Sequence, residues 1–408
     1  MAEPYTGRTH DDLADLAREL LLAGHLIDRS GMPHLIGRFG RDGMRDIAID
    51  EWMAASPIYS KRMQRLLGFE GDTVETIFKG MQLDVGAPPE FMDFRYSVAD
   101  DHHGEFHLAH CGALMDVEPM GDDYVEAMCH DIEDPTFDAT AAATNPRAQV
   151  RPIHRPPRVP ADRHPHCAWT VTIEPEAEPL PYPAQAQGLG SSAAARLPLA
   201  APPTDLPADD GWNDYAAPLD PDLVLERFSS ATLAAICDEV ALQGHLLSRA
   251  FLLHTAERSS VEEATAIGTK QLAGIAGLTS KRLAALLGVG PDLAGVAAVL
   301  AVHPMFLPRA YVDRTISTDG AELHLTLGPS PAHTDGDGLT WPALLVEHAD
   351  DGLRAAVQCV APQSRITASE TGSWTISIDP EAPPAPQPDE VTLTEFSTGA
   401  VFRFRRRG

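Results

Sequence analysis

The chain has 408 residues, of which 44% are hydrophobic, a length that suggests two or three ordinary domains. It carries 59 acidic and 31 basic residues, a formal net charge of −28, which argues against nucleic acid or anionic lipid as a partner. No apolar run approaches the length of a membrane-spanning helix, so no membrane segment is expected. The odd number of cysteines, five, and the lack of a basic and apolar leader predict a cytoplasmic protein.

The chain contains two copies of one sequence pattern. Matching residues lie 220 positions apart, among them the pairs His25/His245, Arg29/Arg249 and Arg62/Arg282. Further on the offset drifts: Glu105–Leu108 matches Glu322–Leu325, and Trp169–Ile173 matches Trp374–Ile378. Residues that both copies keep are expected to serve the fold, so we expect three matched pairs to be architectural: His25/His245, Arg29/Arg249 and His34/His254. Residues that one copy alone keeps point to function.

The first copy begins with helical periodicity and then changes to strands. Leu13, Leu16 and Leu20 form an apolar stripe at helical spacing within residues 10–70. The helix is expected to break at Ser56-Pro57, because the residue before proline disfavours the helical conformation. Residues 94–98 and 105–111 predict a hairpin, in which His107 and Cys111 share a face. A short helix at 121–132 and a strand at 168–174 complete this copy.

The predicted fold is therefore α+β: a tandem duplication in which each half is a helical bundle followed by a small, mostly antiparallel sheet. The first repeat covers residues 1–174 and the degenerate second repeat covers 221–408. Between them, residues 175–220 are rich in proline and alanine, a composition that predicts an unordered linker. We expect the repeats to pack as an intramolecular pseudo-dimer, with the site in the first.

The first half carries cysteine, histidine and carboxylate residues that the second half lacks at matching positions. These residue types form ligand sets for zinc or iron, and they lie on three separate segments, as in a site assembled by the fold. The predicted metal ligands are Cys111, Cys129, His130 and Cys167. The predicted catalytic residues are Asp131, Glu133 and His166.

Two other interpretations of these residues stay open. In the first, no metal is bound and the Cys129 thiolate is a nucleophile, with His130 or His166 as its base. In the second, the cysteines only fill the core, since free cysteine is among the most buried residue types.

A basic, proline-rich passage follows in the same half. Arg151, His154 and Arg155 are predicted to bind the substrate, as a positively charged lip for a carboxylate or phosphate. The alternative is a polar loop whose charges neutralise nearby acidic residues. The sequence favours neither the substrate-binding role nor the neutralising role over the other.

The order of a strand-borne Cys111, a helical Cys129 followed closely by Asp131, and Cys167 before the last strand resembles the L-2-amino-thiazoline-4-carboxylate hydrolase-like family of bacterial proteins. The resemblance covers roughly residues 20–175. It implies hydrolytic opening of a small cyclic, amidine-like thiazoline. The chain departs from this pattern by its second copy and by the histidines beside its cysteines, at positions 110, 130 and 166.

The leading functional prediction is a cytoplasmic, hydrolase-like enzyme that acts on a small polar and anionic molecule through a metal-bound water or a cysteine thiolate. The alternative is a non-enzymatic protein, either a sensor of a small ligand or metal or an accessory subunit of an enzyme complex. A duplicated architecture suits both the enzyme and the non-enzymatic protein. Measuring the metal content of the purified protein would distinguish the metal-dependent possibilities from the others.

Overall fold

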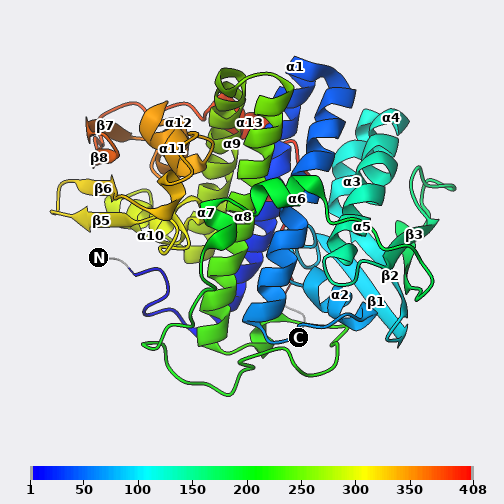
Figure 1. Cartoon of the computed structure of the whole chain (residues 1–408). Coiled ribbons are helices and arrows are strands. Elements are labelled where there is room, and N and C mark those ends of the chain that lie inside the picture. The colour runs from blue at the N-terminus through cyan, green and yellow to red at the C-terminus, as the bar shows by residue number, and fades with distance from the viewer. Residues whose placement is uncertain (1–2, 406–408) are drawn as a thin grey trace.

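The computed structural model describes residues 3–405. Two four-stranded antiparallel sheets lie on opposite flanks of a central helical bundle (Figure 1). Their strand orders, β1-β2-β4-β3 and β5-β6-β8-β7, are the same, and each sheet follows a helical region. The prediction of a two-part α+β fold is confirmed at this level. No helix in the described part of the chain is both long and apolar enough to span a bilayer.

The central bundle consists of α1 (His10–Leu66), α8 (Ser230–Arg258) and α9 (Val261–Leu287). Helix α1 is interrupted at Gly40, whose φ of 72° and ψ of 177° are not helical, and its two arms pack side by side. The interruption corresponds to the turn between α8 and α9. The expected break at Ser56-Pro57 is wrong, because α1 continues through Pro57. The chain reverses direction at Gly40 instead, where the backbone needs a positive φ that glycine adopts without strain.

Shorter helices pack around the central bundle and the sheets. In the first repeat they are α2 (Val74–Met81), α3 (Gly112–Val117), η1 (Glu118–Met120), α4 (Asp122–Glu126), the π-helical η2 (Ala127–Ile132) and α5 (Glu133–Ala142). In the second they are η3 (Leu225–Arg227), α10 (Leu293–Val302), η4 (Pro304–Phe306), η5 (Pro331–His333), α11 (Trp341–Glu347) and α12 (Asp351–Gln358). Of these, α2, α5, α10 and α12 are in contact with strands. The helix expected at 121–132 is confirmed as α4 and η2 together.

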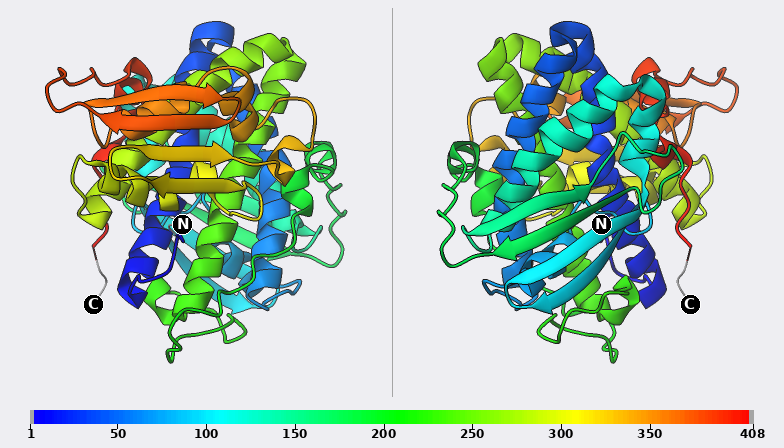
Figure 2. Two further views of the ribbon diagram at one scale, coloured as in Figure 1. Left: turned by 90° about the vertical axis from the view of Figure 1, so that its left-hand side faces the viewer. Right: turned by 90° about the vertical axis from the view of Figure 1, so that its right-hand side faces the viewer.

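The two sheets occupy separate sides of the molecule (Figure 2). Their strands are β1 (Met92–Asp100), β2 (His103–Cys111), β3 (Ala148–His154), β4 (Cys167–Ile173), β5 (Arg314–Thr318), β6 (Leu323–Leu327), β7 (Ser364–Glu370) and β8 (Ser373–Ile378). Phe106 lies opposite Trp169, and Leu325 lies opposite Trp374. Strand β2 therefore matches β6 at an offset of 219, and the sequence match of Glu105–Leu108 with Glu322–Leu325 is wrong by two residues.

Residues 175–220 are not the unordered linker that their composition predicted. They contain α6 (Ala184–Leu189) and α7 (Ala193–Arg196), which cross the front of the bundle toward the second repeat (Figure 1). Leu189, Ala194 and Leu197 are buried there. The small side chains of this segment allow it to pack closely on the bundle. It is therefore ordered by contacts with the bundle and has no core of its own. A matching tail, α13 (Asp389–Thr394) and η6 (Thr398–Val401), follows the second sheet 205 residues later.

Each tail contacts the other repeat at an equivalent place. The backbone N–H of Ala193 donates to Oδ1 of Asp335 at 2.9 Å, and that of Thr398 donates to Oδ1 of Asp116 at 2.7 Å. Asp116 and Asp335 correspond through the offset of 219. The tails are thus exchanged between the repeats.

Two buried ion pairs join the repeats in the same reciprocal way. Arg62 of the first repeat donates to both oxygens of Glu239, at 2.8 and 2.7 Å. Arg282 of the second repeat donates to both oxygens of Glu19, at 2.7 and 2.8 Å. Each arginine also donates to backbone carbonyls of its own repeat's tail. The interface is therefore built from one contact used twice, as in a symmetric dimer.

We expect Arg62→Met and Arg282→Met each to lower the free energy of unfolding by about 3–5 kcal/mol, because each leaves a buried glutamate unpaired. Chemical denaturation measures the change. The matched control is Arg65→Met, which removes an exposed pair with Glu70 and should cost less than about 1 kcal/mol. A large loss for one buried arginine and none for the other would contradict the reciprocal interface.

Candidate functional site

The first repeat contains an open pocket of about 110 Å³, here called the polar chamber because four ionisable side chains interrupt its mostly apolar wall. Its walls include His25, Asp28 and Arg29 from the first arm of α1, and Glu133 from the start of α5. Strand β1 and the second arm of α1 complete the walls. The chamber adjoins an apolar cavity of about 410 Å³, with which it shares Arg29 and three apolar residues.

Several buried polar groups of the chamber have few hydrogen-bond partners. Oε2 of Glu133 has none among the described residues, the ring of His25 contacts only the backbone of Val85, and Oδ1 of Asp28 has only the carboxyl group of Glu51. Buried polar groups in folded proteins are nearly always hydrogen-bonded, so several poorly satisfied groups around one cavity need an explanation. A ligand with polar groups of its own would supply the missing partners.

Burial gives the chamber groups unusual protonation states. It raises the pKa of Glu133 to about 8, while the nearby Arg155 opposes this shift. Burial, and then the positive charge of Arg29, lower the pKa of His25 to about 3. At neutral pH Glu133 is therefore mostly a protonated acid and His25 a neutral imidazole. Groups tuned in this way are typical of acid–base sites.

Asp28 of the chamber wall pairs with a second acid, Glu51. Burial raises the pKa of Glu51 well above its usual range, and the adjacent Asp28 raises it further. Burial also raises the pKa of Asp28, but the charge of Arg29 and a hydrogen bond from Trp52 Nε1, at 2.8 Å, oppose this shift. Glu51 is therefore the more readily protonated member of the pair. Two carboxyl groups in contact cannot both ionise easily.

The second repeat lacks this set of groups. At the offset of 220, Asp28 corresponds to Ser248 and Glu51 to Gln271. Through the matched strands β3 and β7, Glu133 corresponds to Ala349. The equivalent histidine, His245, is satisfied, since its Nε2 lies 3.0 Å from the carbonyl oxygen of Leu307. The acids therefore belong to the first repeat alone.

The predicted cysteines are core residues in this structure. Cys111, Cys129 and Cys167 are all buried, and burial raises the pKa of each thiol, that of Cys111 to about 12. Cys111 Sγ accepts the backbone N–H of Leu114 at 3.3 Å and so caps α3. Protonated thiols are poor nucleophiles and poor metal ligands, which favours the interpretation that these residues fill the core.

Cys111, Cys129 and Cys167 lie near enough to raise one another's pKa, but the predicted metal ligands do not form a group within coordination distance. Among residues 3–405, the one group of three metal-ligating side chains with ligand atoms within 4.8 Å is Asp319, Glu322 and His324, around the exposed β5–β6 turn. His130 Nε2 instead lies 2.7 Å from the carbonyl oxygen of Pro156. The geometry gives no support to a zinc or iron centre at Cys111, Cys129, His130 and Cys167.

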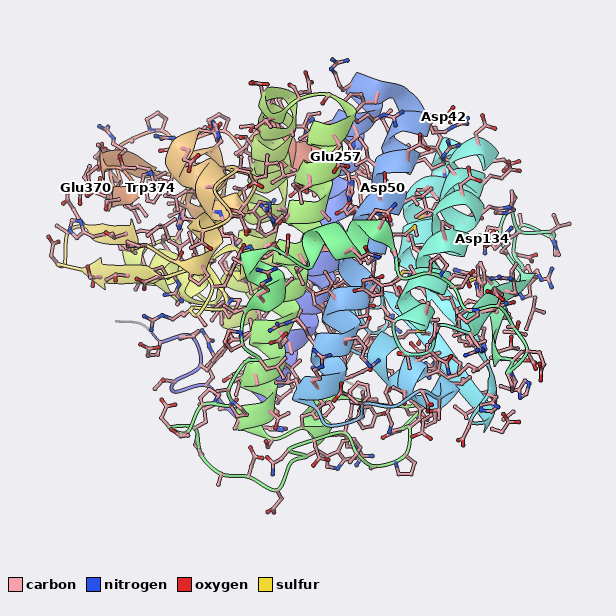
Figure 3. The ribbon with its side chains drawn as sticks, in the orientation of Figure 1. Asp42, Asp50, Asp134, Glu257, Glu370 and Trp374 are labelled. Atoms are coloured by element: carbon pink, nitrogen blue, oxygen red, sulfur yellow. The ribbon has the colours of Figure 1, made fainter. Side chains whose placement is uncertain are left out.

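The remaining predicted residues mostly lie outside the chamber. His166 Nδ1 accepts the backbone N–H of Cys111 at 3.1 Å, and Asp131 is exposed beside Arg45. Arg151 pairs with Asp138 and Arg155 with Asp134, and His154 is half-buried. Figure 3 shows Asp134 on the flank of the molecule opposite Trp374. The basic passage thus neutralises acids of α5, and of the predicted catalytic residues only Glu133 lines the chamber.

Sequence reasoning missed Asp28 and assigned His25 and Arg29 to architecture. His245 Nε2 lies 3.0 Å from a carbonyl oxygen, whereas the ring of His25 contacts the backbone of Val85 and lines the chamber. The informative signal was the difference between Asp28 and Ser248 at matched positions, three residues from a shared histidine. Identity between the copies concealed the site, because its histidine and arginine are conserved in both.

Comparison with protein-family models, with curated proteins and with solved structures finds no match to this chain. The resemblance to the thiazoline carboxylate hydrolase-like family therefore stays a prediction. Functional inference rests on the chamber itself.

Glu133→Gln should change how stability depends on pH. The pKa of Glu133 is about 8 in the fold, against an ordinary value of 4.5, so its stabilising contribution is complete below about pH 4.5 and is lost as pH rises through about 8. Glutamine cannot ionise, so the variant should gain in Tm relative to the wild type by at least about 2 °C more at pH 8.5 than at pH 5. The exposed Glu126→Gln should show no such pH-dependent gain.

Proposed function

We propose that the first repeat is an enzyme that performs acid–base, hydrolase-like chemistry on a small molecule held in the chamber. The observation that carries the proposal is the set of buried polar groups around one cavity, His25, Asp28 and Glu133, of which Glu133 Oε2 has no partner among the described residues. Such polarity is costly to the fold unless it serves a ligand. The absence of the two acids from the second repeat supports a functional role over an architectural one.

The protonation states suggest a division of roles. Asp28, which accepts a hydrogen bond from Trp52, takes a proton from a water molecule as that water attacks an electrophilic carbon of the substrate. Glu133, held protonated, donates its proton to the departing nitrogen, oxygen or sulfur atom. One proton is thereby taken up and one released, so the overall reaction consumes only water. Opening of a cyclic amidine, as the family resemblance implies, has this form.

The second repeat supports the first in this proposal. We propose that the chain is a tandem duplication packed as an intramolecular pseudo-dimer, on the basis of the repeated strand order and the two reciprocal ion pairs. The five free cysteines suit a reducing, cytoplasmic setting. The alternative is a non-enzymatic small-molecule sensor, favoured by the four methionines in the walls of the apolar cavity, since methionine-rich surfaces accommodate varied ligands.

The test is turnover of 2-amino-thiazoline-4-carboxylate and of a panel of small carboxylate esters and amides by the purified protein. Asp28→Asn and Glu133→Gln should each lower kcat/KM by roughly 10²–10⁴-fold, because each removes a proton-transfer group. Wild-type activity should fall as pH rises through about 8, where Glu133 ionises. The exposed Glu126→Gln is the control and should retain activity.

Two outcomes would contradict this assignment. Turnover that survives in both Asp28→Asn and Glu133→Gln would place the chemistry elsewhere. Saturable binding of these compounds with no turnover would instead identify a sensor.

A further inference from the structure

The second repeat shows how this fold binds a carboxylate with the arginine that both repeats keep. Arg249 donates through Nη1 and Nη2 to the two oxygens of Asp337, at 3.0 and 2.8 Å. Its Nε lies 3.3 Å from Asp335. One guanidinium thus meets two carboxylates, one of them through a bidentate fork.

In the first repeat the same arginine meets only one carboxylate. Arg29 Nε donates to Asp116, the counterpart of Asp335, at 3.1 Å. The counterpart of Asp337 is Glu118, and both of its oxygens accept hydrogen bonds from Arg158 instead, at 2.9 and 2.7 Å. Among residues 3–405, no carboxylate pairs with Nη1 or Nη2 of Arg29.

The unpaired end of Arg29 is directed to the cavities. Its side chain is only 5% exposed, and the residue lines both the polar chamber and the apolar cavity. The one contact of a terminal nitrogen with hydrogen-bond geometry is from Nη1 to Met32 Sδ, at 3.9 Å, a weak acceptor. A buried guanidinium with free donors is a binding group for a planar anion.

The apolar cavity beside Arg29 has room for the rest of such a ligand. Its volume of about 410 Å³ is within the range of small-molecule sites. Apart from Arg29 and Tyr124 its walls are apolar, among them Met32, Ile36, Met44, Val117 and Met128.

The tail of the second repeat supplies one wall of this cavity. Leu393 and Phe396 line it and are 39% and 45% exposed, although they are large apolar residues. At the offset of 205 between the tails, the first tail has Gly188 and Ser191 in their places. At these two positions, large apolar side chains therefore occur on the tail that faces the cavity and not on the other.

The same tail is fixed above Arg29. Ser397 Oγ and Thr398 Oγ1 donate to the two oxygens of Asp116, at 2.6 and 2.8 Å. Asp116 in turn holds Nε of Arg29. The position of the tail and the orientation of the guanidinium are thus coupled through one carboxylate.

We propose that the ligand is an amphipathic carboxylate, bound through a bidentate ion pair with Arg29 and with its apolar body against Leu393 and Phe396 of the second repeat. This inference rests on the proposed function in that it names the substrate class of the same site. The ligand carboxylate takes the place that Asp337 occupies in the second repeat. Leu393 and Phe396 determine specificity for the apolar body, so the second repeat completes the site of the first.

The test is calorimetric titration of the full chain with hexanoate, octanoate and octanamide. Octanoate should bind at one site per chain and about tenfold more tightly than octanamide, because only the carboxylate pairs with the guanidinium. It should also bind more tightly than hexanoate, by about three- to fourfold for each added methylene that the cavity buries.

The role of Leu393 and Phe396 in specificity is tested by replacing them with the residues that the first tail has at the matched positions. The double variant Leu393→Gly, Phe396→Ser should weaken octanoate binding by at least about fivefold and reduce the difference between octanoate and hexanoate. Val261→Ser is the matched control, since it removes another exposed apolar side chain, at the start of α9, and should leave octanoate affinity unchanged. Arg29→Gln should remove the preference for octanoate over octanamide, and circular dichroism verifies that this variant is folded.

The outcomes separate this inference from the proposed function. Equal affinity for octanoate and octanamide, or wild-type octanoate binding by the tail variant, would overturn the ligand class even if the chamber turns over another substrate. Carboxylate binding that depends on Arg29 and the tail would support it even if Asp28→Asn and Glu133→Gln leave every reaction unchanged. If the Arg29→Gln variant does not fold, the tail variant and the comparison of octanoate with octanamide still test the ligand class.

Discussion

The carboxylate of Asp116 is fully buried, and this single charge constrains much of the architecture. A buried carboxylate is tolerated only when an opposite charge and several donors surround it. Here they come from Arg29 on α1 and from Ser397 and Thr398 at the far end of the chain. Satisfying one charge therefore requires the last segment to fold back onto the first helix. The counterpart at Asp335 imposes the same requirement on the first tail, through Ala193. The interlocking of the two repeats follows from the need to solvate these two aspartates.

The sequence predicts the arrangement of helices and sheets better than the helix break in α1 and the segments that follow each sheet. Alternating apolar residues and the repeated tryptophan strands anticipate two similar sheets, because the burial of one face imposes a period of two residues. The reversal inside α1 was misplaced because Pro57 is locally a stronger helix breaker than Gly40, and tertiary packing tolerates the proline. The tails were misread for a related reason. Composition reports how much apolar surface a segment can bury by itself, whereas α6 and α7 are ordered by surfaces that the rest of the chain supplies.

The candidate site was only partly predictable for a different reason. Cysteine and histidine are rare and chemically conspicuous, so their restriction to the first half drew attention to Cys111 and Cys129, which are buried thiols. Glu133 was identified because it lies in the same sequence segment. Asp28 could have been found from its replacement by Ser248, but the significance of that change depends on which side chains surround a cavity. Arg29 and Arg249 are the same residue type and differ in the side chains that face them. The difference arises because Glu118, which is 89 residues from Arg29 in the chain, pairs with Arg158 instead.

The exchange of tails also bears on how two copies of one unit can come to differ. In an assembly of identical separate chains, every substitution appears at both sites, so a lost carboxylate is lost twice. Joining the copies in one polypeptide removes that symmetry. Ser248 then coexists with Asp28, and Gly188 coexists with Leu393, because each position mutates independently. Since each tail contacts the opposite repeat, the two copies can differ in their acidic groups while each still supplies a contact to the other. The covalent connection between the repeats is thus a condition for their specialisation.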